Sequence, residues 1–283
     1  MSRPKISILV SIYANRAKQF KLSLQSLANQ KFNPNSVELL VFIDCSRYKS
    51  ILDYLNKYNH IFSAVTYFTF HKKNNIVTHS CTRRNFLALH AHGEYLLFCE
   101  PEILHISNTI KICLDFIQKD RYKYWLCGPT YGTDGMVNSK GDVVVYEYAK
   151  REKINSLLSL IKNGRLDLSD PKTVKYYNKI DEKKFKIFFF CALLHRKQFI
   201  KLGGLNQKLR VRGWEEIEFH QRFLKNKGKY IFNNKFVTCH LPHKKSFDVV
   251  LQKGWDLYNS TVLFDKNQKI DNINEQITTH FIL

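Results

Sequence analysis

Short apolar runs alternate with helix-like segments over roughly the first 130 residues of the chain. Five runs are typical of buried strands: Ile6–Ile12, Val37–Asp44, Val65–Phe70, Glu94–Cys99 and Tyr122–Cys127. Between the first two, apolar residues recur at the spacing of one helix face (Phe20, Leu24, Leu27, Ala28), and a second helix is expected at about 79–92. Strands that alternate with helices predict an α/β fold with a mostly parallel, twisted sheet flanked by helices.

The pattern changes after residue 130. The expected elements are a loop at Thr130–Gly135, a strand at Gly141–Tyr148, a short helix at Ile154–Ile161, a strand at Phe185–Leu194, a helix at Trp214–Asn226 and a last strand at Tyr230–His240. The stretch Asn163–Lys184 is polar and charged, and Asp170-Pro171 within it is a turn signal. We interpret this middle region as an insertion in one large domain.

Basic residues far outnumber acidic ones. The 283 residues include 45 Lys and Arg against 24 Asp and Glu, which gives a formal charge of +21, and the hydrophobic fraction of 44% excludes a disordered chain. Such an excess favours anionic partners, which are nucleotides, nucleic acid or an anionic membrane surface. No RNA-recognition motif, zinc finger or recognition helix is present, so we expect no nucleic acid partner.

The cysteines and the apolar runs bear on location. Seven cysteines with no Cys-x-x-Cys pair fit a reduced, cytoplasmic compartment better than a disulfide framework or a zinc ribbon. No signal peptide is evident after Met1. The strongly apolar run at 187–194 is much shorter than the roughly 18–20 residues that span a bilayer, so we expect at most a peripheral association with an anionic membrane.

Two groups of carboxylates lie where elements begin or end. Glu215, Glu216 and Glu218 crowd the start of the expected helix at 214–226, and Glu100 and Glu102 flank a proline after the strand that ends at Cys99. Acidic side chains also simply stabilise the first turn of a helix, and this structural alternative applies to both groups. Because ligands of open α/β sheets bind beyond the carboxyl ends of the strands, the two groups together suggest one polar site built from both halves.

Two further positions carry candidate chemistry. Asp44 ends the second strand, where a carboxylate can accept from a base or a ribose, although it could equally cap a turn. His240 closes the last strand and is a metal ligand only if it meets Glu102 in space. The pair Glu218 and Arg222, spaced i and i+4 with the acid first, is interpreted as a structural ion pair.

Four blocks of this sequence resemble the family-2-type glycosyltransferases of the GT-A fold. They are Ile6–Tyr13, Glu38–Ser46 with Asp44 at the second acid of Asp-Asp-Gly-Ser, Cys81–Tyr95 with Arg-Asn and Gly-Glu-Tyr, and Leu202–Leu205 followed by Gly213–Phe219. The resemblance implies a domain at 1–245, with a nucleotide-sugar-binding half (1–130), a mobile insertion (131–185) and an acceptor-side half (186–245), followed by an extension (246–283).

The resemblance also implies an activity and roles for single residues. The activity is an inverting hexosyl or hexosaminyl transfer from a nucleotide-diphosphate sugar, with a UDP-sugar as the first candidate, to a glycan, lipid-linked or protein acceptor in glycan or polysaccharide biosynthesis. The implied roles are the general base for Glu216, donor binding for Ile12, Tyr13, Asp44, Arg84 and Glu100, the acceptor side for Trp214 and Glu215, and a divalent Mn²⁺ or Mg²⁺ ion held by Glu102 and His240.

The chain departs from the family by placing glutamate where the family prefers aspartate in both acidic motifs. The extra methylene moves each carboxylate outward, which affects metal geometry more than the role of a general base. Two alternatives therefore stay open, a non-catalytic GT-A-like module that binds nucleotide or glycan and, more remotely, a basic protein that binds nucleic acid.

Overall fold

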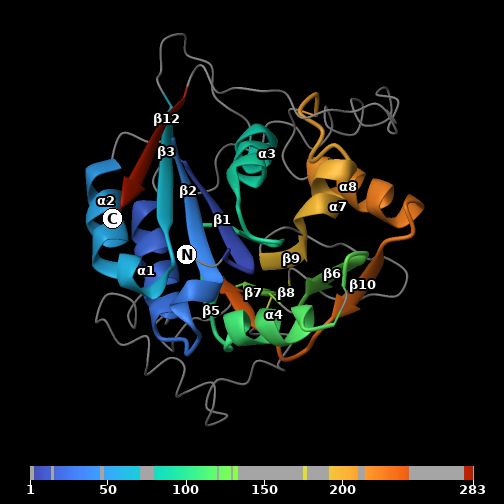
Figure 1. Ribbon diagram of the computed structural model, residues 1–283, viewed down its shortest axis with the longest axis horizontal. Coiled ribbons are helices and arrows are strands. Elements are labelled where there is room, and N and C mark those ends of the chain that lie inside the picture. Colours follow the sequence, from blue (N-terminus) through green and yellow to red (C-terminus); the bar gives the residue numbers. More distant parts are fainter. Residues whose placement is uncertain are drawn as a thin grey trace.

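The computed structural model describes residues 3–13, 16–44, 48–70, 80–119, 121–128, 130–132, 175–176, 191–209, 214–241 and 277–282. Its strands form an eight-stranded sheet in the order β10-β6-β9-β4-β1-β2-β3-β12 and a four-stranded sheet in the order β5-β11-β7-β8 (Figure 1). The strands are β1 (Ile6–Tyr13), β2 (Val37–Asp44), β3 (Val65–Phe70), β4 (Tyr95–Cys99), β5 (Ile103–His105), β6 (Tyr124–Cys127), β7 (Thr130–Gly132), β8 (Lys175–Tyr176), β9 (Cys191–His195), β10 (Lys229–Phe232), β11 (Thr238–His240) and β12 (Ile277–Ile282). The helices are α1 (Ala17–Ala28), α2 (Tyr48–Tyr58), α3 (Ser80–His90), α4 (Thr109–Ile117), α7 (Arg196–Lys201) and α8 (Trp214–Lys225).

The mostly parallel α/β sheet predicted from the sequence is confirmed. Strands β4, β1, β2 and β3 run parallel as neighbours, whereas β9 and β12 are inserted antiparallel. Successive residues of β1 are buried on opposite faces, because Ile8 belongs to one apolar cluster and Leu9 to the other. A strand that is apolar on both faces requires cover on both, which is typical of a parallel sheet between two layers of helices.

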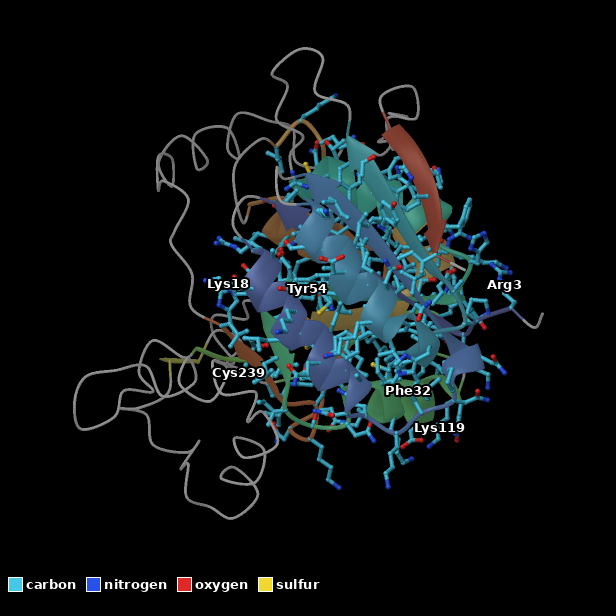
Figure 2. The ribbon with its side chains drawn as sticks, turned by 90° about the vertical axis from the view of Figure 1, so that its left-hand side faces the viewer. Arg3, Lys18, Phe32, Tyr54, Lys119 and Cys239 are labelled. Carbon is cyan, nitrogen blue, oxygen red and sulfur yellow. The ribbon has the colours of Figure 1, made fainter. Side chains whose placement is uncertain are left out.

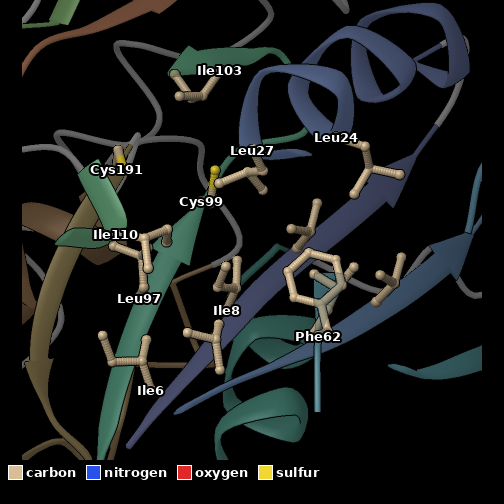
Figure 3. Close-up of a cluster of buried hydrophobic side chains, with 14 of the residues drawn as sticks. Ile6, Ile8, Leu24, Leu27, Phe62, Leu97, Cys99, Ile103, Ile110 and Cys191 are labelled. Atoms are coloured by element: carbon tan, nitrogen blue, oxygen red, sulfur yellow. The ribbon is translucent and has the colours of Figure 1, made fainter. Parts of the chain in front are cut away.

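Helices supply that cover on each face. On one face, α1 and α2 contribute Phe20, Leu24 and Ile51 to the cluster that contains Ile8, and Figure 3 shows Leu24 and Leu27 of α1 above Ile6 and Ile8. Figure 2 looks onto these two helices, with Lys18 on α1 and Tyr54 on α2. On the other face, α3, α7 and α8 pack their apolar residues against the sheet (Figure 1).

Two expectations for the second half of the chain are wrong. Thr130–Gly132, expected as part of a loop, forms strand β7 and pairs with β11. The single strand expected at 230–240 is two strands in different sheets, because β10 pairs with β6 and β11 pairs with β5 and β7. Asn233 breaks the run, since its side chain accepts a hydrogen bond from the backbone N–H of Lys235 in a local turn.

Several expectations lie outside the described residues. They are the strand at 141–148, the helix at 154–161 and nearly all of the insertion at 131–185. Of the extension at 246–283, the described part is β12, which pairs antiparallel with β3 and forms one edge of the large sheet. No helix in the described part of the chain has the length and apolarity needed to cross a bilayer.

Candidate functional site

The carboxyl ends of the parallel strands meet at one edge of the large sheet. Tyr13, the last residue of β1, is the register partner of Asp44, the last residue of β2. Cys99 at the end of β4 pairs with Val10 of β1, so Glu100 leaves the sheet beside the end of β1. The residues implied by the resemblance at the donor side therefore share this edge. Ile12 is buried there, and the side chains of Tyr13 and Asp44 are outside the described part.

Arg84 of α3 joins the two acidic groups. Its Nη1 donates to Glu216 Oε1 at 2.7 Å, and its Nη2 forms an ion pair with Glu100. The three side chains are 9%, 8% and 15% exposed, so the contacts are shielded from water. A guanidinium presents its N–H groups in a planar fork that can serve two carboxylates, which a lysine ammonium cannot do in the same fixed geometry. The loop after β4 and the start of α8 are thus tied to one cation.

Three consecutive residues of α3 are buried and polar, and each reaches a different element. Arg83 donates through Nε to Ser11 of β1 at 2.7 Å. Asn85 donates to the carbonyl of Leu205 and accepts from its N–H, both at 2.8 Å. As an isolated arginine pair, Arg83 and Arg84 would be expected on a solvated surface, but they are 3% and 7% exposed. Buried polar groups of this kind are stable only when hydrogen-bonded, as these are.

Glu102 meets His240, the condition under which a metal role for the histidine makes sense. Strand β11 pairs antiparallel with β5 in the register His240 to Ile103, and the N–H of Leu241 donates to the carbonyl of Glu102 at 2.8 Å. This pairing brings Glu102 Oε1 to 3.7 Å from His240 Nε2. The proximity of Glu102 and His240 therefore depends on the pairing of β5 with β11, two short strands far apart in the sequence.

Arg16 lies beside Glu102 and joins the cluster of Glu102 and His240. The sequence alone did not identify it as a site residue. Its Nε lies 3.6 Å from Glu102 Oε1, with 4% and 2% of the two side chains exposed. The residue is the N-cap of α1 and makes no side-chain capping hydrogen bond. A cation at the positive end of a helix is unfavourable by about 0.3–1 kcal/mol. An arginine immediately before a helix is therefore unusual, and this position was the sequence signal that could have identified Arg16 as a candidate site residue.

Glu215 is a buried acid in the first turn of α8. It is 3% exposed and accepts a hydrogen bond from Ser80 Oγ at 2.8 Å. Burial, followed by the charge of Glu216, raises the pKa of Glu215 above its ordinary value, and Arg84 and Ser80 offset this only in part. Glu215 is therefore biased towards the neutral acid. The side chain of Trp214 is outside the described part of the chain.

Glu218 and Arg222 form the structural ion pair expected from their spacing. Arg222 Nη2 donates to Glu218 Oε2 at 2.6 Å and to the carbonyl of Gly204 at 2.7 Å. Gly203 and Gly204 have φ values of 78° and 62°, a left-handed conformation that glycine adopts without steric cost. The pair therefore fixes a glycine turn against α8.

The separation of Glu102 and His240 is compatible with a shared divalent cation. Two ligands at about 2.1 Å from a shared ion lie roughly 3.0–3.6 Å apart, close to the 3.7 Å observed. Carboxylate oxygen and imidazole nitrogen are both suitable ligands for Mn²⁺. Among the described residues, no group of three His, Cys, Asp or Glu side chains could hold a metal.

The fold is that of known sugar-nucleotide enzymes. No protein-family model matches the chain, and neither does any protein of curated function. Among solved structures, S. aureus TarS 1–349 in complex with UDP-GlcNAc is similar, with a TM-score of 0.58, 17% identity, and coverage of 86% of this chain and 60% of that chain. The mannosyltransferase PcManGT from Pyrobaculum calidifontis, in complex with GDP-Man and Mn²⁺, is similar with a TM-score of 0.56 and 13% identity. The match covers 87% of this chain and 59% of that chain.

A third structure, GalNAc-T7 with UDP, GalNAc and Mn²⁺, has a TM-score of 0.55 and 13% identity, with coverage of 86% of this chain and 44% of that chain. The chain thus spans less than two thirds of each of these proteins. At these identities the likeness is one of fold: the chain has the GT-A-like fold of nucleotide-sugar glycosyltransferases.

Proposed function

We propose that the chain is a glycosyltransferase that moves a sugar from a nucleoside-diphosphate sugar to an acceptor hydroxyl. The observation that carries the proposal is the double contact of Arg84 with Glu100 and Glu216. It links the loop at the donor edge of the sheet to a carboxylate at the start of α8. A displacement at the anomeric carbon needs a donor site and an acceptor-side base close to each other.

In the proposed reaction Glu216 is the general base. Its carboxylate takes the proton of the acceptor hydroxyl, the acceptor oxygen bonds to the anomeric carbon, and the bond to the diphosphate breaks with its electron pair on the diphosphate oxygen. One such displacement inverts the configuration. Arg84 supports the role because its Nη1 donates a hydrogen bond to Glu216 Oε1 and so fixes the position of this oxygen.

The second requirement of the reaction is that the negative charge on the leaving diphosphate is neutralised. Glu102 and His240 would hold a divalent ion, which neutralises charge on the diphosphate when it is bound. Two of the similar structures contain both Mn²⁺ and a nucleotide or nucleotide sugar, which supports the same role here. Glu100, bound by Arg84, is placed to fix the loop that carries Glu102.

The nucleobase is assigned to the ends of β1 and β2. Asp44 and Tyr13 are register partners there, next to the buried Ile12, and a carboxylate at this place can accept from a base N–H. Similar structures bind GDP-Man in one case and UDP-GlcNAc in another, so the fold is compatible with either base. We propose a UDP-sugar, from which a hexosyl or hexosaminyl unit passes to the acceptor.

The acceptor side is assigned to the start of α8, with Trp214 and Glu215. A glycan, a lipid-linked glycan or a protein hydroxyl is the proposed acceptor, in glycan or polysaccharide biosynthesis. The charge of +21 supports a peripheral contact with anionic membrane, at about 1 kcal/mol for each exposed Lys or Arg near the surface. Co-sedimentation with phosphatidylserine vesicles should occur at low salt and disappear at high salt. Its absence at low salt would end the membrane part of the proposal.

A screen of nucleotides tests the donor assignment. UDP, GDP and ADP are added with and without Mn²⁺, and the shift in unfolding temperature reports binding, because a ligand of the native state stabilises it. UDP should give the largest shift, and Asp44→Ala should reduce it. An unchanged UDP affinity in Asp44→Ala contradicts the nucleobase assignment. Hydrolysis of UDP-sugars by the purified protein then tests the activity itself.

A non-catalytic binding module is the competing function. It is favoured by the burial of the acids, since each of Glu100, Glu102 and Glu216 lies beside an arginine. Such a module would bind UDP but would neither hydrolyse nor transfer any sugar. The two functions are separated by turnover, because they predict the same nucleotide binding.

A further inference from the structure

Arg16 places a permanent positive charge beside the carboxylate proposed to bind metal. Its Nε approaches the same oxygen, Glu102 Oε1, that lies nearest to His240 Nε2. A guanidinium stays protonated at any physiological pH. Because both side chains are almost fully buried, solvent screens the charge only weakly.

This charge opposes a second cation at the site. The single negative charge of Glu102 is already balanced by Arg16, and the N-terminus of α1 adds partial positive charge at the same place. A divalent ion held by Glu102 and His240 would therefore enter an environment with no net negative charge from these groups. A nucleoside diphosphate changes this balance, since it brings at least two negative charges and oxygen ligands for the ion.

We propose that Arg16 couples metal binding to donor binding, so that a divalent cation binds at Glu102 and His240 together with the diphosphate and only weakly without it. The inference rests on the proposed function, because it assumes that the site takes a nucleoside diphosphate. Arg16 is a positioning residue in this scheme. It acts through its charge, since its Nε faces the carboxylate that would bind the ion. The arrangement would prevent the protein from holding metal at a site without substrate.

Binding of Mn²⁺ without nucleotide is the direct test. Free Mn²⁺ is followed by electron paramagnetic resonance in titrations of the wild type and of Arg16→Gln. The variant should bind Mn²⁺ tighter by roughly tenfold or more, since a neighbouring charge shifts even the proton affinity of a carboxylate by 1–3 pKa units. UDP and GDP are then added. Either nucleotide should raise the Mn²⁺ affinity of the wild type strongly and that of Arg16→Gln much less.

Three variants control for structure and general charge. Arg16→Lys keeps the positive charge and should bind Mn²⁺ as weakly as the wild type. Lys18→Gln removes a charge from an exposed residue of the same helix and should behave like the wild type. In the background of Arg16→Gln, Glu102→Gln should abolish the added Mn²⁺ binding. Circular dichroism establishes that each variant is folded.

The outcomes separate the inference from the proposed function. Equal Mn²⁺ affinity in folded Arg16→Gln and wild type overturns the inference, as does a wild type that binds Mn²⁺ equally well with and without UDP. Both results leave the transferase proposal standing. If neither UDP nor GDP binds in any condition, the proposed function fails and the inference fails with it.

Discussion

Arg84 Nη1 and Glu216 Oε1 are 2.7 Å apart in a largely buried contact between α3 and α8. The same guanidinium binds Glu100, so one side chain compensates two carboxylates from separate halves of the chain. A buried network of this kind is more sensitive to the loss of one member than to the replacement of all of them.

Arg84→Gln should therefore destabilise the protein by about 3–5 kcal/mol, because it leaves two carboxylates in a shielded site without their cation. Urea unfolding measures the loss. Replacing the partners as well, in Arg84→Gln with Glu100→Gln and Glu216→Gln, should recover part of the stability. A change below about 0.5 kcal/mol in Arg84→Gln would mean that solvent screens these charges in solution.

Glu216→Gln should reduce turnover by roughly 10²–10⁴-fold while nucleotide affinity stays near that of the wild type. The amide keeps the size of the side chain and can still hydrogen-bond, but it cannot accept the proton of the acceptor. Initial rates of donor hydrolysis or transfer and the nucleotide dissociation constant are measured together. Glu94→Gln is the matched control, because Glu94 is exposed and precedes the amino end of β4. Normal turnover by Glu216→Gln would exclude this mechanism.

His240→Ala should remove the effect of Mn²⁺ on the UDP-induced thermal shift. The expectation follows from its 3.7 Å separation from Glu102 Oε1, which a shared ion can bridge. UDP binding in the presence of EDTA should change little. A variant that is merely less stable, with an undiminished Mn²⁺ effect, would assign His240 a structural role.

Glu215→Gln should become progressively more stable, relative to the wild type, as the pH rises above about 4.5. The folded-state pKa of Glu215 is raised above its ordinary value of 4.5 by burial. Between that value and the raised pKa, the folded state keeps a proton that the unfolded state releases, so rising pH favours unfolding of the wild type. Glutamine removes this contribution. Urea unfolding from pH 4 to pH 8 measures the difference, and a difference that does not vary with pH would contradict the pKa shift.

Gly93→Ala should destabilise the fold without affecting the chemistry of each folded molecule. A Cβ at this position would lie 2.5 Å from Ser7 Oγ and 2.6 Å from Ser7 N. The Gly93 N–H donates to Ser7 Oγ and to the buried Glu38, so the backbone cannot easily withdraw. Overpacking of this kind costs about 1–3 kcal/mol. Because the contact lies at the amino end of β1, remote from the site, turnover normalised to folded protein should be unchanged.

The first three strands could be predicted to within one residue at each end. Their apolar runs are buried on both faces of the sheet, so composition alone marks them. The second sheet could not be predicted, because β5, β7 and β11 have three residues each and find their partners far away in the sequence.

The site divides in the same way. That Glu100 and Glu216 belong to one site could be inferred, since each lies at the end or start of an element at the carboxyl edge of the sheet. The contact of Arg16 with the cluster of Glu102 and His240 could not be inferred from the sequence, because this cluster exists only after β5 and β11 have paired. The functional roles assigned to all of these site residues remain predictions, and for Ile12, Tyr13, Asp44 and Trp214 the structure adds no side-chain contact.

Both acidic motifs have glutamate where the resembled family prefers aspartate, and Glu100, Glu102 and Glu216 each lie beside an arginine. An aspartate at position 216 would withdraw its oxygens by about one bond length, beyond the reach of a hydrogen bond with Arg84 that now measures 2.7 Å. Glu216→Asp alone would thus break the contact with Arg84 and leave its charge without this partner. The acids and their arginines form an epistatic unit, in which substitutions are tolerated together and not one at a time.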